Sequence, residues 1–239
     1  MNKVENEVEI IVKTFKGVEP ILEKEIKQLT NKQLKPLNRG FSLTGTKEDL
    51  YKLNYHLRTA TSVLKPIKSF YIRDLDDLYY KVNKMNWEDI FSTEQTFSIE
   101  HSIYADFINH TQFAALRVKD AIVDRFMDKQ NKRPDVERDN PDFVINVHIS
   151  RNNCDISLNS SGNSLFKRAY RTEAGEAPLK ENLAAGLVLL SDWDRKSTLV
   201  DPFCGSGTIA IEAAMIAMNM PPGYFRFFSF ENWKDFDKD

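Results

Sequence analysis

Two hydrophobic periodicities alternate along the N-terminal quarter of the chain. Residues 8–14 carry apolar, β-branched side chains at every second position, which predicts a strand. Residues 18–29 carry them three or four positions apart with Pro20 near the start, which predicts a helix. Residues 39–44 alternate again and residues 47–57 return to helical spacing. Strand, helix, strand and helix in this order indicate a small α+β unit of ferredoxin-like type.

A second α+β pattern follows. Its expected elements are strands at residues 63–70, 97–103, 143–149 and 154–158, helices at 75–84 and 113–126, and a short helix end at 87–90. The helix at 113–126 presents an apolar stripe through Phe113, Leu116, Ile122 and Phe126, which Ala115 and Val118 widen. The polar residues 129–142 contain two prolines and predict a loop. The turn residues Arg151, Asn152 and Asn153 predict a hairpin between the last two strands.

A third pattern begins after residues 160–164, whose sequence Ser-Ser-Gly-Asn-Ser is typical of a linker. Beyond it the residues become small and apolar. A helix is expected at 178–190, a short buried strand at 197–202 and an apolar helix at 208–218. This order is typical of an α/β domain.

Composition narrows the class of protein. A chain of 239 residues is long enough for two domains, and its 41% hydrophobic and 28% charged residues are typical of a soluble globular protein. The net charge of -2 does not indicate a nucleic-acid binder, although it can conceal a local basic face. The N-terminus does not resemble a signal peptide, and the longest apolar run, residues 183–190, is too short to cross a membrane. Cys154 and Cys204 form no disulfide or zinc pattern, so we expect a cytoplasmic protein without a metal site.

The strongest candidate for a ligand-binding site is the segment from residue 198 to 208. An apolar strand ends in Asp201, turns through Gly205 and Gly207, and enters an apolar helix. Such a turn places backbone and unpaired helix N–H groups where a ligand can bind. No lysine follows the glycines, which excludes a P-loop. A plain strand-to-helix turn and a nicotinamide-binding turn both remain alternatives, but an acid directly before the glycines suits the charged tail of a cofactor better.

The sequence DPFCGSGTIAIEAA at residues 201–214 closely resembles the nucleotide-binding motif of Rossmann-fold RNA methyltransferases that carry a THUMP domain. Residues 164–171 (SLFKRAYR) and 177–185 (APLKENLAA) resemble the segment that this family places just upstream. The whole chain is similar to bacterial 23S rRNA guanine-N2 methyltransferases. The resemblance implies a ferredoxin-like region at residues 1–60, a THUMP RNA-binding domain at 61–159 and the N-terminal part of a Rossmann-fold methyltransferase domain at 160–239.

The resemblance also implies S-adenosylmethionine as the cofactor. The residues that match its pocket are Asp201, Pro202, Phe203, Cys204, Gly205, Ser206, Gly207, Thr208, Pro178, Lys180, Glu181 and Asn182. The family's catalytic Asn-Pro-Pro-Tyr-type motif and its ribose-binding acid are not found in the sequence, so no catalytic residue is assigned. We therefore expect a fragment, a truncated gene product or one half of a split gene, inactive alone. Residues 165–239 should be poorly stable by themselves, because so few elements cannot bury both faces of a parallel sheet.

RNA is the expected partner, with large-subunit rRNA implied by the resemblance. Candidate contacts are basic residues after the linker and along the second helical region, namely Lys167, Arg168, Arg171, Arg117, Lys119 and Arg133. Acids are interleaved with several of them, so a mixed surface helix fits nearly as well. Glu212 interrupts an apolar helix and is expected at the surface. An RNA-binding module without catalytic activity is the alternative function, and a nicotinamide enzyme is a third.

Overall fold

The computed structural model describes residues 7–170 and 179–236, and the chain divides into two compact units. One unit contains Met1–Val63 and Asn163–Phe228, and the other contains Leu64–Gly162 and Ser229–Asp239. The chain therefore leaves the first unit near Val63 and returns to it at Asn163. We call these the first and second unit and describe each separately.

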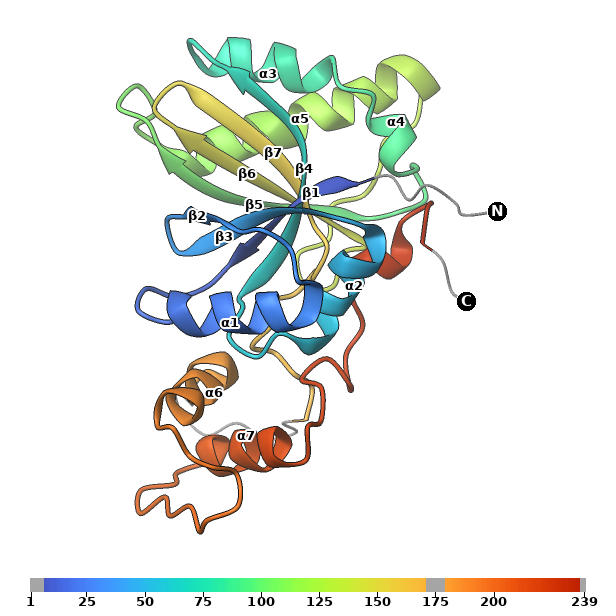
Figure 1. The fold of residues 1–239 in the computed structure, drawn as a ribbon. Coiled ribbons are helices and arrows are strands. Elements are labelled where there is room, and N and C mark those ends of the chain that lie inside the picture. The colour runs from blue at the N-terminus through green and yellow to red at the C-terminus, as the bar shows by residue number, and fades with distance from the viewer. Residues whose placement is uncertain (1–6, 171–178, 237–239) are drawn as a thin grey trace. The chain divides into compact units, whose positions relative to one another are not determined.

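The N-terminal part of the first unit is a three-stranded antiparallel sheet with two helices (Figure 1). Its elements are β1 (Val8–Lys13), α1 (Glu19–Thr30), β2 (Lys35–Leu37), β3 (Gly40–Gly45) and α2 (Lys47–His56). The strand order is β2-β3-β1, with Ile10 paired to Leu43. Both of these side chains are buried, together with Leu22 and Ile26 of α1, which confirms the ferredoxin-like prediction. The sequence pattern missed β2, since it is only three residues long and contains Pro36.

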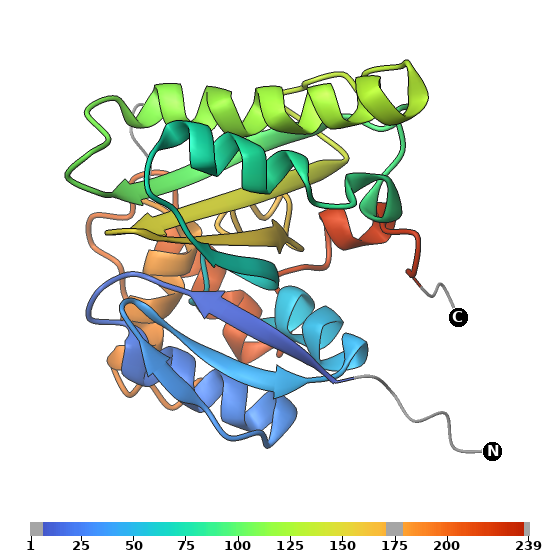
Figure 2. The ribbon, with the colours of Figure 1, turned by 90° about the horizontal axis from the view of Figure 1, so that it is seen from above.

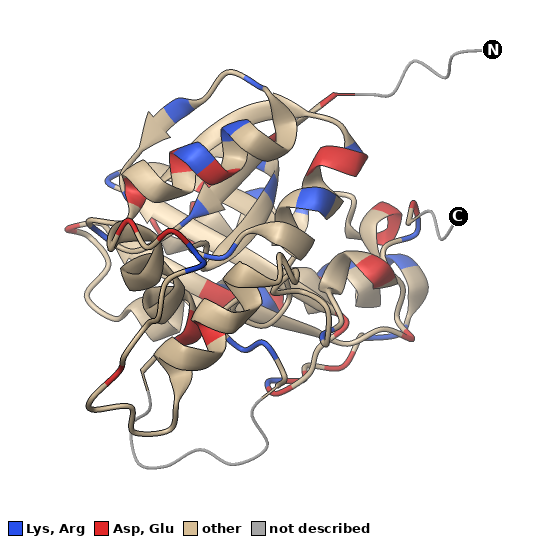
Figure 3. Ribbon diagram, turned by 60° about the horizontal axis from the view of Figure 1, so that its bottom comes forward, with Lys and Arg blue, Asp and Glu red and all other residues tan. Residues whose placement is uncertain are grey.

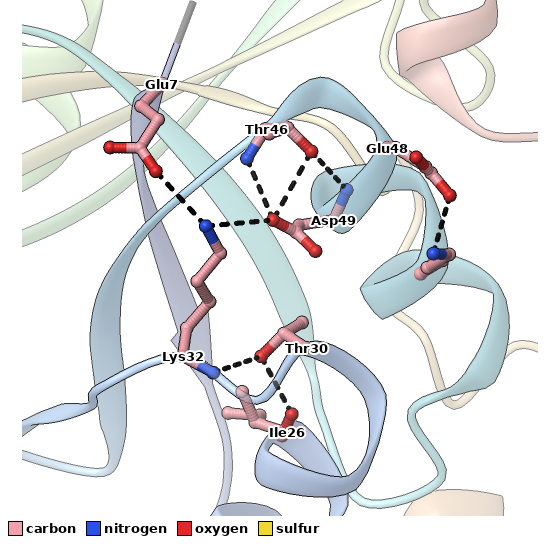
Figure 4. Close-up of polar contacts among 8 residues, drawn as sticks. Glu7, Ile26, Thr30, Lys32, Thr46, Glu48 and Asp49 are labelled. Atoms are coloured by element: carbon pink, nitrogen blue, oxygen red, sulfur yellow. Dashed lines mark hydrogen bonds and ion pairs between the residues drawn. The ribbon is translucent and has the colours of Figure 1, made fainter. Parts of the chain in front are cut away.

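A capping box fixes the start of α2 (Figure 4). The backbone N–H of Asp49 donates to Thr46 Oγ1 at 3.2 Å, and the backbone N–H of Thr46 donates to Asp49 Oδ2 at 2.9 Å. Lys32 Nζ lies 3.9 Å from the same carboxylate and 3.1 Å from Glu7 Oε1. The reciprocal bonds satisfy two backbone donors that a helix start would otherwise leave unpaired.

The Thr46→Ala substitution should lower the free energy of unfolding by about 1 kcal/mol, because it removes the acceptor for the Asp49 N–H. Urea denaturation followed by circular dichroism measures the loss. Thr46→Ser keeps the hydroxyl and is the matched control, so equal losses in both variants would argue against the cap.

The second unit is a four-stranded sheet with helices on one face (Figure 2). Its elements are β4 (Ser62–Tyr71), α3 (Leu75–Asn83), α4 (Trp87–Ile90), β5 (Phe97–Tyr104), α5 (Thr111–Gln130), β6 (Phe143–Ser150), β7 (Asn153–Asn159) and the 3-10 helix η1 (Ser229–Asn232). The strand order is β4-β7-β6-β5, and β5 and β6 run parallel. The predicted strands, the helices and the hairpin turn at residues 151–152 are confirmed.

Alternation along the strands separates the two faces of this sheet. Ile145, Val147 and Ile149 of β6 are fully buried, whereas Asn146 and His148 between them are half-exposed. An aromatic cluster forms the core of the unit. Its members are Trp87, Phe91, Phe97, Phe126 and Phe143, with ring centroids 5.0–6.4 Å apart along the contacts that link them.

The apolar stripe of α5 was predicted wrongly at its N-terminal end. Phe113 and Leu116 are 52% and 41% exposed, whereas Ala114, Ala115 and Val118 are buried. A helix turns by about 100° per residue, so Phe113 lies on nearly the opposite side from Ile122, which is in the core. The spacing of apolar residues in the sequence therefore placed in one stripe residues that lie on different faces of the helix.

The rest of the first unit is a pair of packed helices, α6 (Glu181–Leu190) and α7 (Thr208–Ala217) (Figure 1). Their contact is a cluster of Ala185, Val188, Ala213 and Ile216, with Leu189, Trp193, Leu199 and Ile209 against it. The helices confirm two predictions. In the described residues of this part, however, the strand expected at 197–202 is absent, and Val200 is 76% exposed. A strand forms only where a neighbour accepts its backbone hydrogen bonds, and none of the described residues does so here.

The predicted linker at residues 160–164 contains the point where the chain passes from the second unit to the first, between Gly162 and Asn163, and it is ordered. Ser160 and Ser161 are fully buried, and Asn159 Nδ2 donates to the carbonyl of Gly162 at 3.0 Å. The segment is a hydrogen-bonded turn, because its polar side chains and backbone find partners inside the protein.

Within the described ranges, no helix is both long enough and apolar enough to span a bilayer.

Candidate cofactor-binding site

The loop from residue 201 to 207 leads directly into the N-terminus of α7. Gly205 and Gly207 have φ of 52° and 72°, in the left-handed region that favours glycine. A side chain at either position would meet no atom within 4 Å, so the backbone conformation, not crowding, requires glycine here. The Gly207 N–H donates to Cys204 O at 2.8 Å and closes the turn.

Most side chains of this loop are on the surface. Phe203 is 93% exposed and Asp201 is half-buried, with Asp201 Oδ1 accepting the Phe203 N–H at 3.3 Å. Thr208 is buried, and its Oγ1 lies 3.2 Å from Ser206 Oγ. Gly207 precedes α7 without a side-chain cap, so the first N–H groups of that helix lie beside the loop. The loop therefore combines a carboxylate, an exposed ring and helix N–H donors.

The predicted upstream residues lie at the start of α6. Lys180 precedes the helix, and its Nζ lies 5.0 Å from the centroid of the Phe166 ring. Asn182 is fully buried and its Nδ2 donates to Ala60 O at 3.0 Å, while its Oδ1 has no hydrogen-bond partner among the described residues. Glu181 is buried. Pro178 lies outside the described residues.

Four consecutive carbonyls at residues 58–61, which we call the carbonyl segment, join the ferredoxin-like part to the α6–α7 part of the first unit. The Arg58 carbonyl accepts from Arg168 Nη2, and the Ala60 carbonyl accepts from Asn182 Nδ2. The Thr61 carbonyl accepts from the Leu165 N–H at 2.9 Å. The remaining carbonyl, that of Thr59, binds Thr14 Oγ1 at 2.8 Å. The position of α6 thus depends on residues more than 100 positions earlier in the chain.

A buried ion pair joins the segment after the turn to α7. Arg168 Nη1 lies 2.6 Å from Glu212 Oε2, and both side chains are at most 1% exposed. The Tyr170 hydroxyl donates to the other carboxylate oxygen at 3.0 Å. The surface position expected for Glu212 is therefore wrong. Arg168 is equally inaccessible to a phosphate, so its predicted RNA contact is also wrong: the guanidinium pairs with an acid from the apolar helix instead.

Burial sets the ionisation of this group. It raises the pKa of Glu212, and the positive charge of Arg168 counteracts the rise. Burial likewise lowers the pKa of Arg168 and raises that of Tyr170, which therefore keeps its proton and donates to the carboxylate. The geometry favours a charged pair with a neutral phenol.

The other basic residues predicted to contact RNA are scattered. Arg117 pairs with Asp76 at 2.8 Å, Lys119 with Asp120 at 2.7 Å, and Arg133 is exposed. Lys167 is exposed in the first unit, and Arg171 lies outside the described residues. Lysine and arginine are interspersed with acids along the ribbon (Figure 3), so no single basic stripe emerges from them.

Three domain families match the chain in order. The RlmL ferredoxin-like domain matches residues 9–64, the THUMP domain matches residues 72–159, and the RMKL-like methyltransferase domain matches residues 168–239.

Several known proteins are similar over nearly the whole chain. The ribosomal RNA large subunit methyltransferase K/L of Psychromonas ingrahamii is 43% identical over 95% of this chain and 30% of its own length. The protein slr0064 of Synechocystis sp., described as an RNA methyltransferase, is 40% identical over 94% of this chain and 59% of its own length. This chain therefore spans from 30% to 59% of the length of these relatives.

Solved structures give the same picture. The crystal structure of SMU.472, described as a methyltransferase complexed with SAH, superposes with a TM-score of 0.82 at 30% identity, over 98% of this chain and 62% of that one. A Listeria monocytogenes protein described as an N6-adenine-specific DNA methylase superposes with a TM-score of 0.83 at 30% identity, over 98% of this chain and 61% of that one. Both descriptions name methyl transfer, and only that of the Listeria protein names a nucleic acid, which is DNA.

Proposed function

Because the chain belongs to the family that joins a RlmL-type ferredoxin-like domain and a THUMP domain to an RMKL-like methyltransferase domain, we propose that it is the front of an S-adenosylmethionine-dependent RNA methyltransferase. It docks RNA and supplies part of the cofactor pocket. The observation that carries the proposal is the loop of residues 201–207, with two left-handed glycines ahead of an uncapped helix.

The residues of this loop fit the cofactor chemically. The carboxylate of Asp201 suits the ammonium group of the methionine end, and the exposed ring of Phe203 offers an apolar surface. The open space around Gly205 and Gly207 lets a ligand approach the backbone, and the N–H groups of α7 suit a carboxylate. When bound, the cofactor supplies the methyl group, and these residues hold and orient it.

We further propose that the chain binds cofactor and RNA without turnover by itself. Its sequence contains no Asn-Pro-Pro-Tyr-type motif, and Met220-Pro221-Pro222-Gly223 follows α7 instead of a strand. The target base must also be drawn out of its stack and held near the methyl group, which needs a closed pocket. No described residue is assigned as catalytic.

For the substrate we infer guanine N2 of large-subunit rRNA, acted on in the cytoplasm. The names of the K/L relatives support rRNA, and the THUMP match supports RNA over DNA. The description of the Listeria protein as a DNA methylase makes double-stranded DNA the competitor to include in binding assays.

Calorimetric titration of the 239-residue chain with S-adenosylhomocysteine tests the cofactor half of the proposal. Asp201→Asn should raise the Kd roughly tenfold or more, because it removes a charged acceptor worth about 1.5–3 kcal/mol. Asp192→Asn is the control, since Asp192 is an acid of the same unit that lies outside the loop. Absence of binding by the unmodified chain, or equal losses in both variants, would contradict the assignment of this loop.

A further inference from the structure

One face of the sheet in the second unit is not covered by its helices. The helices α3 and α5 lie on the other face (Figure 2). Cys154 and Ile149 are fully buried, as expected for side chains on that covered face. Phe70 pairs with Cys154, and Ile103 pairs with Ile149, so these four residues share the helix-covered face. The next residue along each strand must therefore point to the open face.

Those next residues form a row across all four strands. Tyr71 of β4 pairs with Asn153 of β7, Asn153 pairs with Ser150 of β6, and Ser150 pairs with Tyr104 of β5. All four are exposed, and the two tyrosines are exposed by 57% and 68%. We call these four residues the tyrosine row. Two large aromatic side chains thus stand on the first and last of these four strands, on one open sheet face, with small polar residues between them.

Hydrogen bonds hold the row in place. The Arg151 N–H donates to Tyr104 O at 2.7 Å, which ties the hairpin turn to β5. On the other side Asn152 binds Ile72 twice, with its carbonyl accepting the Ile72 N–H at 2.7 Å and its Nδ2 donating to Ile72 O at 2.8 Å. The turn is therefore fixed to the C-terminal ends of β4 and β5.

The second row of the open face supports Tyr104. His148 lies beside the ring of Tyr104, with centroids 6.2 Å apart, and its Nδ1 is 2.8 Å from Ser102 Oγ. The segment that contains η1 contacts the opposite end of the sheet, where Ser229 Oγ donates to Asp142 O and the Phe230 N–H donates to Ser160 O.

Two arginines border the row. Arg151 in the turn is exposed, and Arg73 after β4 has 76% of its side chain exposed, although its Nε is 3.5 Å from Asp77. Asp74 and Asp106 are exposed in the neighbouring loops. Charge at this end of the sheet is therefore mixed, and a strong electrostatic attraction for duplex phosphates is not expected.

We propose that the tyrosine row, bordered by Arg73 and Arg151, binds unpaired bases of single-stranded RNA. Exposed aromatic side chains on an open sheet face stack on bases, and guanidinium groups beside them stack or contact phosphates. A duplex offers no free base faces to such a surface. The inference rests on the proposed function, because it assigns RNA docking to one place in the second unit and selects single strands over duplexes.

Fluorescence anisotropy of the full chain with a short labelled single-stranded oligoribonucleotide tests the assignment. Tyr71→Ala and Tyr104→Ala should each raise the Kd roughly tenfold. Tyr80→Ala is the matched control, because Tyr80 is 54% exposed but lies on α3, and it should change the Kd by less than about twofold. Circular dichroism establishes that all three variants fold.

Two further readouts separate stacking from charge. The tyrosine variants should keep the salt dependence of binding, whereas Arg151→Ala should reduce its slope by about one. The same strand annealed to its complement should bind the tyrosine variants and the unmodified chain equally. Tyrosine variants that bind the single strand as well as Tyr80→Ala does, or that lose duplex affinity to the same extent, would overturn the proposal.

Failure of the wider function gives a different result. If the unmodified chain binds no RNA, docking by this chain is refuted and the tyrosine row with it. If the unmodified chain binds RNA but the substitutions in the tyrosine row do not change the Kd, RNA docking stands and only the assignment to the row is refuted. S-adenosylhomocysteine affinity of the tyrosine variants should equal that of the unmodified chain, since the row lies in the other unit.

Discussion

Replacing Glu212 with leucine is expected to lower the free energy of unfolding by about 3–5 kcal/mol. The change leaves the guanidinium of Arg168 buried, with the Arg58 carbonyl as its remaining acceptor among the described residues. It also removes the acceptor of the Tyr170 hydroxyl. A buried charge without its partner keeps the full cost of desolvation. The fall in the free energy of unfolding is therefore larger than the net contribution of the intact ion pair. Urea unfolding, with hydrogen exchange of α7 as a local reporter, measures it.

A double-mutant cycle separates the ion pair from the packing around it. Arg168→Met should be similarly costly, and the Arg168→Met, Glu212→Leu double variant should lose much less than the sum, because no unpaired charge remains. Glu23→Leu is the control in the same unit: its partner Lys27 is exposed, so the change should cost less than about 0.5 kcal/mol. Additive losses in the cycle would show that the two charges do not stabilise one another.

Gly40→Ala adds a single methyl group and is expected to lower the free energy of unfolding by about 3 kcal/mol or more. A Cβ at this position would lie 2.1 Å from the carbonyl oxygen of Val12 in β1. No rotation of a side chain relieves a contact with backbone, so β3 would have to move away from β1, with which Gly40 pairs through Lys13. The stability of the variant, measured by thermal unfolding, should fall accordingly.

Gly17→Ala distinguishes this clash from ordinary backbone strain. Gly17 has a φ of 92°, but an added Cβ would meet no atom within 4 Å. The expected cost is about 1–3 kcal/mol from the left-handed backbone alone. A variant of Gly17 that is less stable than the variant of Gly40 would show that strain outweighs the clash.

Hydrophobic periodicity predicted correctly the elements whose pairing partners are adjacent in the sequence. The β6–β7 hairpin was predicted from alternation and a three-residue turn signal because strand, turn and strand are adjacent in the chain. The resemblance to THUMP-containing methyltransferases is confirmed by the three domain matches. The domain boundaries at residues 60 and 160 stay predictions.

The failures share a cause, which is dependence on residues far away in sequence. Arg168 and Glu212 are 44 positions apart, so charge patterning along the chain could not pair them. One signal was present: Glu212 interrupts the apolar run of α7, and an acid that is fully buried is almost always paired. Residues 197–202 likewise have the composition of a strand, but strand formation depends on a neighbour and not on composition alone.

The carbonyl segment at residues 58–61 also has an evolutionary consequence. Its acceptors are backbone atoms, which no point mutation removes, whereas the donors Arg168 and Asn182 are side chains that a mutation can lose. Recombination that exchanged the ferredoxin-like part for another module would leave buried donors unsatisfied. These two parts should be inherited together, whatever happens to the THUMP-matched region between them.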